Sequence, residues 1–257
     1  MSPISILTYH SIDVSGSVLS SAPQRFADQM SQLSDNGFRG VSLHEAVAHR
    51  NQHGSWPEKN VALTFDDGFA NVYESALPVL VKHGFTATVF VISGHMGGLN
   101  DWAKPPSELG VQKMLSWQQA SELAAAGIEI GSHTRTHPDL RLCGFETARQ
   151  EMMDSRKEIE DHLSQNVNSF AYPYGSTNRA LRVLVAKEFG AACTTELRRA
   201  NSDSLESLPR VDMYYIRSQR NLQRLLDGHL DRYLAVRALG RVVRSALTTG
   251  LLRAGKE

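Results

Sequence analysis

Short apolar runs and longer segments with helical periodicity alternate along most of the chain. Runs rich in strand-forming residues cover 4–8, 61–65, 86–91, 128–132 and 169–172. Between them, apolar side chains recur every three or four residues, and Gly37, Gly84 and Gly190 end several of these segments. About seven strand–helix units of this kind predict an α/β fold, a distorted (β/α) barrel of about seven strands.

Length and composition agree with one main domain. The chain has 257 residues, of which 41% are hydrophobic, enough to bury one large core. We assign 1–229 to this domain and 230–257 to an amphipathic, basic helical tail. The 27 Lys and Arg residues balance 27 Asp and Glu residues, so the charge gives no reason to expect nucleic-acid binding. The two cysteines provide no Cys-based metal motif.

Two adjacent carboxylates, Asp66 and Asp67, follow the apolar run 61–65. Consecutive side chains of a strand point to opposite faces, so both can serve one site only if the chain turns there, and Gly68 permits that turn. Two desolvated carboxylates side by side repel each other unless a cation lies near them. Taken alone, Asp-Asp-Gly is more typical of a plain turn. Further ligands are needed for a cation site.

His133 and His137 can supply those ligands. They follow the run 128–132, and Pro138 disfavours helical angles at His137, so we expect them on a loop. A divalent ion such as zinc binds His nitrogen and carboxylate oxygen at about 2.0–2.2 Å and accepts three protein ligands plus water. The ends of parallel strands meet at one rim, which brings both groups together. The sequence therefore predicts a metal site with a spare carboxylate.

A third segment, 169–175, is a strand that breaks at Pro173 and Gly175. With these three motifs, Thr-Phe-Asp-Asp-Gly, His-Thr-x-x-His and Tyr-Pro-Tyr-Gly, the chain resembles the polysaccharide deacetylases of carbohydrate esterase family four. The resemblance covers roughly residues 4 to 230. It includes a Tyr-His pair at 9–10, an Asn-Asp-Trp sequence at 100–102 and a Leu-Pro-Arg sequence at 208–210.

The resemblance implies a role for each residue of these motifs. Asp66 would be the catalytic base, and a backbone N–H at Tyr174 would hold the oxyanion beside Pro173 in the groove wall. The implied metal ligands are Asp67, His133 and His137. The implied cofactor is a divalent ion, first of all zinc, although nickel, cobalt and manganese accept the same ligands. The implied reaction removes N-acetyl groups from an amino-sugar polysaccharide or glycan precursor and releases acetate.

The chain departs from the family pattern at two positions. Ala171 stands where the family carries the Arg that orients the base, and we expect Arg210 to replace it, because a guanidinium binds a carboxylate through two hydrogen bonds. A surface ion pair is the alternative for Arg210. The late His that serves the family as general acid has no counterpart, since His229 resembles a helix-end residue. We assign His10 as an acid or substrate contact, with a purely structural histidine as the alternative.

The segment 94–106 is rich in Gly, Asn and Pro and predicts a loop on the same rim. Trp102 in this loop either stacks on a sugar ring of the substrate or packs its own loop.

The tail carries six basic side chains against two acidic ones. It predicts either peripheral contact with an anionic membrane or a helix that covers the barrel. No stretch is long enough to predict a transmembrane span. The first residues lack the features of a signal peptide, so we expect a cytoplasmic location, although a chain trimmed of a leader would look the same.

Three functions are compatible with these residues. The first is a metal-dependent N-deacetylase acting on an acetylated glycan. The second is an O-deacetylase or small-molecule amidohydrolase on the same scaffold. The third is a catalytically silent glycan-binding homologue, which the missing Arg and late His bring into consideration. The motifs favour the first.

Overall fold

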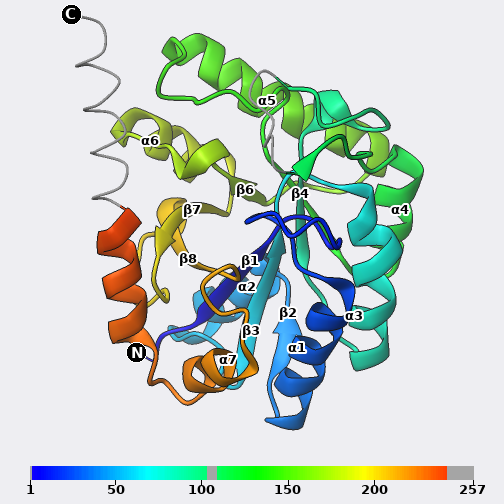
Figure 1. Ribbon diagram of the computed structural model, residues 1–257. Coiled ribbons are helices and arrows are strands. Elements are labelled where there is room, and N and C mark those ends of the chain that lie inside the picture. The colour runs from blue at the N-terminus through cyan, green and yellow to red at the C-terminus, as the bar shows by residue number, and fades with distance from the viewer. Residues whose placement is uncertain (1, 103–108, 242–257) are drawn as a thin grey trace, which may run out of the picture.

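Parallel strands form one sheet that closes on itself (Figure 1). The computed structural model describes residues 2–102 and 109–241, and within them the strand order is β1-β8-β7-β6-β5-β4-β3-β2, with a further pairing of β1 to β3. The ring consists of β1 (Ser5–Tyr9), β3 (Asn60–Phe65), β4 (Thr88–Val91), β5 (Glu129–Ser132), β6 (Ser169–Ala171), β7 (Ala191–Leu197) and β8 (Leu208–Asp212). The short strand β2 (Arg39–Val41) pairs with the amino-terminal half of β3. The predicted barrel of about seven strands is confirmed.

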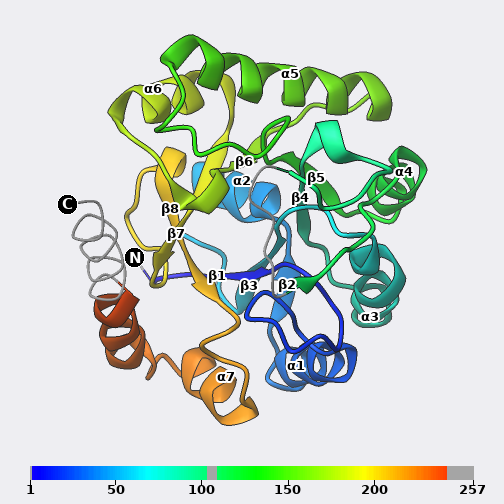
Figure 2. The same ribbon diagram turned by 45° about the horizontal axis from the view of Figure 1, so that its top comes forward.

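Helices cover the outside of this ring (Figures 1 and 2). They are α1 (Pro23–Asp35), α3 (Leu77–His83), α4 (Trp117–Ala125), α5 (Phe145–Leu163), α6 (Arg179–Glu188) and α7 (Gln219–Leu226). Shorter helical turns are η1 (Val72–Ala76), η2 (Ser93–His95), η4 (Pro173–Gly175) and η5 (Leu205–Ser207). The helices bury their apolar faces against the outer sides of the strands, as the helical periodicity predicts.

Each strand is buried on both faces, as in other parallel barrels. In β3, Leu63 and Phe65 belong to the core between strands and helices, whereas Ala62 belongs to the cluster inside the barrel. Thr64 also faces inward, because its hydroxyl accepts a hydrogen bond from the interior Arg210. The alternation therefore brings Asp66, the next inward position, to the mouth of the barrel.

The helix α2 (Leu43–His53) closes the amino-terminal end of the barrel. Its buried residues Leu43, Ala46 and Val47 pack in the interior cluster, and in Figure 2 the helix lies behind the ring of strands. A capping box stands at its start, since Ser42 Oγ accepts from Glu45 N at 3.1 Å and Glu45 Oε2 accepts from Ser42 N at 2.8 Å. The helix is thus held where it excludes water from the interior.

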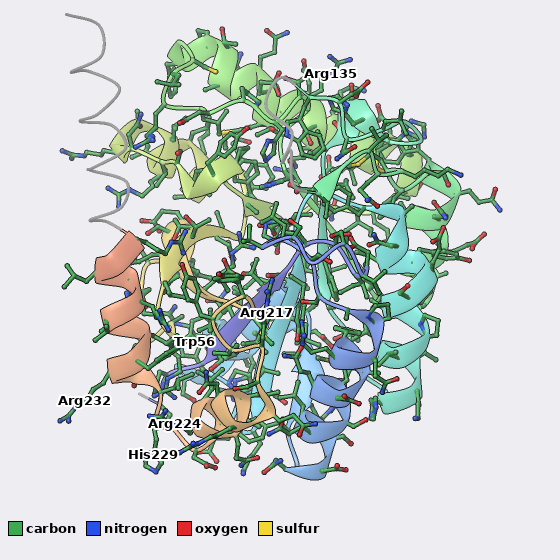
Figure 3. The ribbon with its side chains drawn as sticks, viewed as in Figure 1. Trp56, Arg135, Arg217, Arg224, His229 and Arg232 are labelled. Atoms are coloured by element: carbon green, nitrogen blue, oxygen red, sulfur yellow. The ribbon has the colours of Figure 1, made fainter. Side chains whose placement is uncertain are left out.

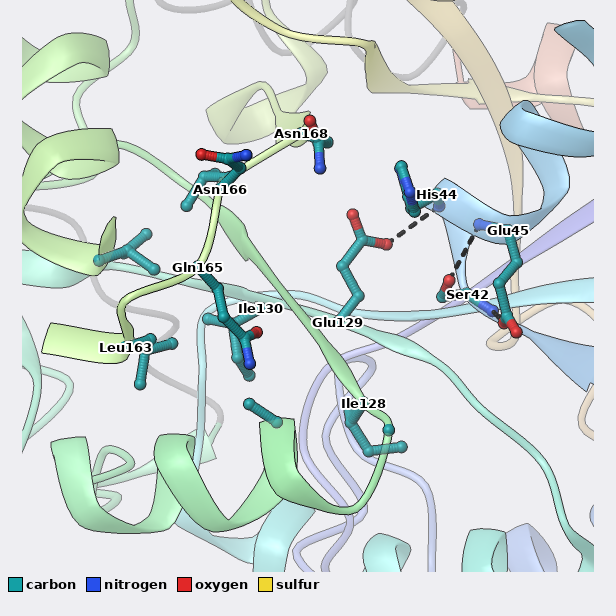
Figure 4. A pocket seen from close by; sticks show the side chains of 14 residues that line it. Ser42, His44, Glu45, Ile128, Glu129, Ile130, Leu163, Gln165, Asn166 and Asn168 are labelled. Atoms are coloured by element: carbon teal, nitrogen blue, oxygen red, sulfur yellow. Dashed lines mark hydrogen bonds between the residues drawn. The ribbon is translucent and has the colours of Figure 1, made fainter. Parts of the chain in front are cut away.

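A pocket of about 310 Å³ lies beside this closed end (Figure 4). The carboxylate of Glu129 lines it and accepts hydrogen bonds from His44 N at 3.0 Å and from Thr88 Oγ1 at 2.6 Å. These contacts join the start of α2 to β4 and β5. The pocket lies at the amino ends of the strands, opposite the rim where the sequence places the candidate ligands.

The first part of the predicted tail packs on the barrel wall. It is helical from Asp231 to Arg241, and Leu230 and Leu234 are fully buried in the main core. Asp231 pairs with Arg199 at 2.7 Å. These contacts agree with the alternative of a covering helix, while residues 242–257, on which the predicted membrane contact also depends, lie outside the described residues. Within the described ranges, no helix combines the length and apolarity that a bilayer crossing requires.

Removing the cap of α2 tests how the closed end is held. We expect Ser42→Ala to lower the free energy of unfolding by about 1 kcal/mol, because it exposes an unsatisfied N–H at the first turn. Urea titration monitored by circular dichroism measures the change. Ser34→Ala, at an exposed position of α1, is the matched control and should leave stability unchanged or slightly raised. Equal midpoints for both variants would contradict the capping role.

Candidate metal centre

Residues from four strands meet at the carboxyl-terminal mouth of the barrel. Asp66 and Asp67 follow β3, His133 and His137 follow β5, Arg210 lies in β8, and His10 follows β1. Ion-pair distances of 2.6 to 3.9 Å define two groups, Asp66 with Arg210 and His10, and Asp67 with His133 and His137. The two groups form one cluster because Asp66 and Asp67 are adjacent in the chain. The structure therefore brings together the predicted ligands, the predicted base, Arg210 and His10.

The spacing of Asp67, His133 and His137 suits a tetrahedral divalent ion. Asp67 Oδ1 lies 3.4 Å from His133 Nε2 and 3.6 Å from His137 Nε2, and one donor atom of each residue lies within 4.8 Å of the others. Two ligands at about 2.1 Å from a tetrahedral ion are about 3.4 Å apart, so the two separations between Asp67 and the histidines fit a divalent ion. All three side chains are buried, which limits competition by bulk water.

The imidazoles present their Nε2 atoms to this space. His133 Nδ1 lies 2.7 Å from the carbonyl oxygen of Ala171, which fixes Nδ1 as the donor and leaves Nε2 free to coordinate. Burial, followed by the charge of His133, lowers the pKa of His137 to about 3, so this ring is neutral as a metal ligand requires. Burial also acts to lower the pKa of His133, but Asp67 and Asp66 outweigh it and raise that pKa. A cation bound here would compete with a proton for Nε2 of His133.

Backbone strain is concentrated at the cluster. Of the six described non-glycine residues with positive φ, four lie here: Asp67 (72°), Thr134 (68°), His137 (59°) and Tyr174 (58°). The turn that the sequence predicts at Gly68 begins one residue earlier, because Asp67 itself takes the left-handed conformation and turns its carboxylate toward the histidines. Such conformations are typical of sites where function sets the geometry.

Arg210 binds Asp66 inside the barrel. Its Nη1 and Nη2 donate to Oδ1 and Oδ2 of Asp66 at 2.7 and 2.6 Å, and its Nε donates to the carbonyl of Thr194 at 2.9 Å. Arg210 is 2% exposed, which excludes the alternative of a surface ion pair. Burial alone would raise the pKa of Asp66, but the guanidinium outweighs it and holds that pKa well below its usual range. Asp66 is therefore ionised and fixed in orientation.

His10 lies on the open side of Asp66. Its Nε2 is 3.9 Å from Asp66 Oδ2, and 19% of its side chain is exposed. Asn71, which the sequence did not single out, ties the segment after His10 to the segment after Asp67, accepting from Ile12 N at 2.9 Å and donating to Ser11 Oγ at 2.7 Å. Asn71 lies just after the paired carboxylates, at the start of a segment with helical periodicity, and this position is the feature of the sequence that indicates a role at the site.

Arg217 and His229, both labelled in Figure 3, lie outside the cluster of six side chains. Arg217 binds the segment that follows His10, because it donates to the carbonyl of Ser17 at 2.9 Å. His229 follows α7, where its N–H donates to the carbonyl of Arg224 at 2.7 Å. It is a helix-end residue, as expected from its sequence context.

Two aromatic rings flank His137. The Trp102 ring lies 5.2 Å and the Tyr174 ring 4.8 Å from it, between ring centroids. Trp102 is 4% exposed and packs in a cluster with Phe69 and Met114, so the described residues favour the packing alternative, and its contact with a sugar stays a prediction. Tyr174 is 45% exposed and borders the site next to Pro173.

Comparison with known proteins identifies the family. The model of the polysaccharide deacetylase family matches residues 53–193. YxkH of Bacillus subtilis is 33% identical over 77% of this chain, and the poly-beta-1,6-N-acetyl-D-glucosamine N-deacetylase of Staphylococcus epidermidis is 26% identical over 60%. The chain belongs to the polysaccharide deacetylase family, and the predicted resemblance is confirmed. It spans 66% of the length of the first relative and 54% of the second.

The similarity to a solved structure agrees with this family assignment. The Streptococcus pyogenes deacetylase PplD, solved in complex with acetate, superposes with a TM-score of 0.77 at 29% identity and covers 88% of this chain and 98% of its own.

Loss of Arg210 should strongly destabilise the protein. Arg210→Met leaves the Asp66 carboxylate buried without a partner, so we expect a loss of about 3–5 kcal/mol in the free energy of unfolding at pH 7. Adding Asp66→Asn to this variant should recover much of that loss, because the unpaired charge is then removed. Urea titration of the two single variants, the double variant and the parent gives the coupling energy. A double variant less stable than both single variants would contradict the pairing.

The same pair predicts a pH dependence. The pKa of Asp66 is lower in the folded than in the unfolded state, so its contribution to stability is present above the unfolded value of about 3.9 and is lost as the pH falls below it. In Arg210→Met the guanidinium that lowers this pKa is lost, and burial, the largest of the remaining effects, raises the pKa of Asp66 relative to the parent. The stability difference between parent and variant should therefore shrink when urea titrations are repeated from pH 7 down to about 4. A constant difference would count against this assignment.

Proposed function

We propose that the chain is a metal-dependent hydrolase that removes N-acetyl groups from an amino-sugar polysaccharide and releases acetate. One observation carries the proposal: a buried Asp-His-His triad lies next to a second carboxylate, Asp66, which Arg210 holds apart from the ligand set. The name of the Staphylococcus epidermidis relative and the acetate bound to the Streptococcus pyogenes deacetylase support it. We infer a polymer of β-linked N-acetylglucosamine as the substrate class.

Asp67, His133 and His137 would hold the ion, with zinc as our first choice. When bound, a divalent ion there would polarise both a water molecule and the acetyl carbonyl. Asp66 accepts the proton that the attacking water loses. Arg210 reduces the proton affinity of Asp66 but keeps it ionised and correctly oriented, so this base suits a water whose acidity is already raised.

The remaining rim residues complete the reaction. The backbone N–H of Tyr174, in its strained conformation, would donate to the oxyanion that forms when water adds to the carbonyl. His10, on the open side of Asp66, would protonate the leaving amine as the C–N bond breaks. The products are acetate and a glucosamine unit.

Exchange of the base tests the proposal directly. We expect Asp66→Asn to lower kcat for acetate release from N-acetylglucosamine oligomers by at least about 10²-fold, the usual range for a general base. Removal of the metal by a chelator should abolish the same activity, and added zinc should restore it. Acetate is measured by an enzyme-coupled assay, with the exposed Asp35→Asn as the matched control.

Two outcomes would redirect the assignment. Oligosaccharide binding without acetate release by the parent protein would favour a silent glycan-binding homologue. Faster release from O-acetylated than from N-acetylated substrates would favour the O-deacetylase.

Substrates with different leaving groups test the role of His10. An amine must be protonated to depart, whereas a nitrophenolate departs unaided, so His10→Gln should lower kcat for N-acetylglucosamine oligomers by about 10²-fold or more and change hydrolysis of nitrophenyl acetate much less. The two rates are compared on one preparation. Equal losses on both substrates would assign His10 to another step, and no loss on either would leave it a structural residue.

A further inference from the structure

The two histidine ligands are held in different ways. His133 Nδ1 is bonded to the carbonyl oxygen of Ala171 at 2.7 Å, which orients the ring directly. His137 Nδ1 is buried and has no hydrogen-bond partner among the described residues. Its Nε2 lies 3.6 Å from Asp67 Oδ1, and its ring is otherwise positioned by packing against Trp102, Tyr174 and His133 and by the backbone that carries it. The loop 133–137 must therefore supply the precision that a hydrogen bond supplies to His133.

The loop itself is in an unfavourable conformation. Thr134 and His137 both have positive φ, at 68° and 59°, which is uncommon for residues other than glycine, and the β-branched Thr134 is a clear outlier there. The hydroxyl of Thr134 accepts from His137 N at 3.0 Å, which closes the turn from inside. Arg135 and Thr136, between the two strained residues, are exposed to solvent. Such a conformation persists only where surrounding contacts impose it.

Polar side chains along one face of α5, a polar stripe, hold the loop 133–137 in this conformation from outside. Glu151, Ser155 and Glu158 lie on one face of the helix, at i, i+4 and i+7. Ser155 Oγ bonds Ser132 Oγ at 2.9 Å, next to His133. Glu158 accepts from Arg135 Nε at 2.8 Å, and Figure 3 shows Arg135 beside α5.

Glu151 makes the most direct contact of the stripe. Its Oε2 accepts from the backbone N–H groups of Arg135 and Thr136 at 3.0 and 2.8 Å, and its Oε1 accepts from Thr136 Oγ1 at 2.8 Å. One carboxylate thus binds three donors on the two residues that separate the strained positions. Hydrogen bonds to an ionised acceptor are the strong ones.

We infer that Glu151 is a positioning residue for the metal centre, which sets the orientation of His137 by holding the backbone of 135–136. The inference rests on the proposed metal site and goes beyond it, because Glu151 contacts none of the ligands. Loss of the carboxylate frees the loop to leave its strained conformation, and His137 Nε2 then moves away from Asp67, with which it would share the ion.

Metal affinity tests this without any substrate. Residues that orient a ligand from outside typically contribute 10- to 100-fold to affinity, so we expect Glu151→Ala to raise the dissociation constant for zinc by about that factor, measured by competition with a chromophoric chelator. The dissociation constant of Glu151→Gln for zinc should lie between those of Glu151→Ala and the parent, since its amide oxygen still accepts both N–H groups. Glu146→Ala is the matched control on α5, because the partner of Glu146 among the described residues is the exposed Arg149, at 3.0 Å.

A second readout separates positioning from general damage. The cobalt-substituted Glu151→Ala protein should show altered visible absorption bands, which report the ligand geometry, while the melting temperature of the metal-free protein changes little. Thr136→Val removes one of the three hydrogen bonds from the other side and should cause a smaller loss of affinity in the same direction. If Glu151→Ala does not fold, the zinc affinity of Thr136→Val tests the inference in its place.

The outcomes are distinct. Zinc affinity and cobalt spectra of Glu151→Ala equal to those of Glu146→Ala would overturn the inference. A parent protein that binds zinc but releases no acetate would contradict the proposed function and leave the role of Glu151 intact. A parent protein that binds no divalent ion would overturn both.

Discussion

The buried ion pair between Arg210 and Asp66 gives two adjacent carboxylates different chemistry. Without it, Asp66 and Asp67 would be equivalent neighbours in a desolvated site, and both could bind a cation or share a proton. The guanidinium binds both oxygens of Asp66, which leaves Asp67 as the carboxylate that faces the histidines. The different surroundings of the two carboxylates therefore follow from one bidentate contact. A buried pair of this kind is costly to desolvate, so its presence indicates positioning more than added stability.

The second constraint is backbone conformation. A strand presents alternate residues to the interior, so Asp66 reaches the mouth of the barrel simply by continuing β3. Asp67 would then point outward, and only its positive φ brings it back to the site. His137 also has a positive φ, and its N–H donates to Thr134 Oγ1, which closes the turn that carries it.

Much of this arrangement could be predicted from the sequence. Strand runs that end in Asp, His or Pro-Tyr-Gly place chemical groups at one rim, because parallel strands share their direction. Other features depend on contacts between distant segments. The sequence left Arg210 open because nothing in its surroundings states that β8 brings it within 2.6 Å of Asp66. The contact of Glu151 with residues 135–136 was not predicted, since a glutamate on a helix is usually solvated, and only the packing of α5 against β5 brings it to the loop.

The position of Arg210 also explains how the chain tolerates Ala171. Both residues face the interior of the barrel, one from β6 and the other from β8, with β7 between them. A guanidinium is long enough to reach the mouth of the barrel from either strand, so what matters is an inward position below Asp66 and not a particular place in the chain. Ala171 still takes part through its backbone, because its carbonyl accepts the hydrogen bond that orients His133. The strand that carries this carbonyl therefore cannot be displaced without releasing the ring of His133.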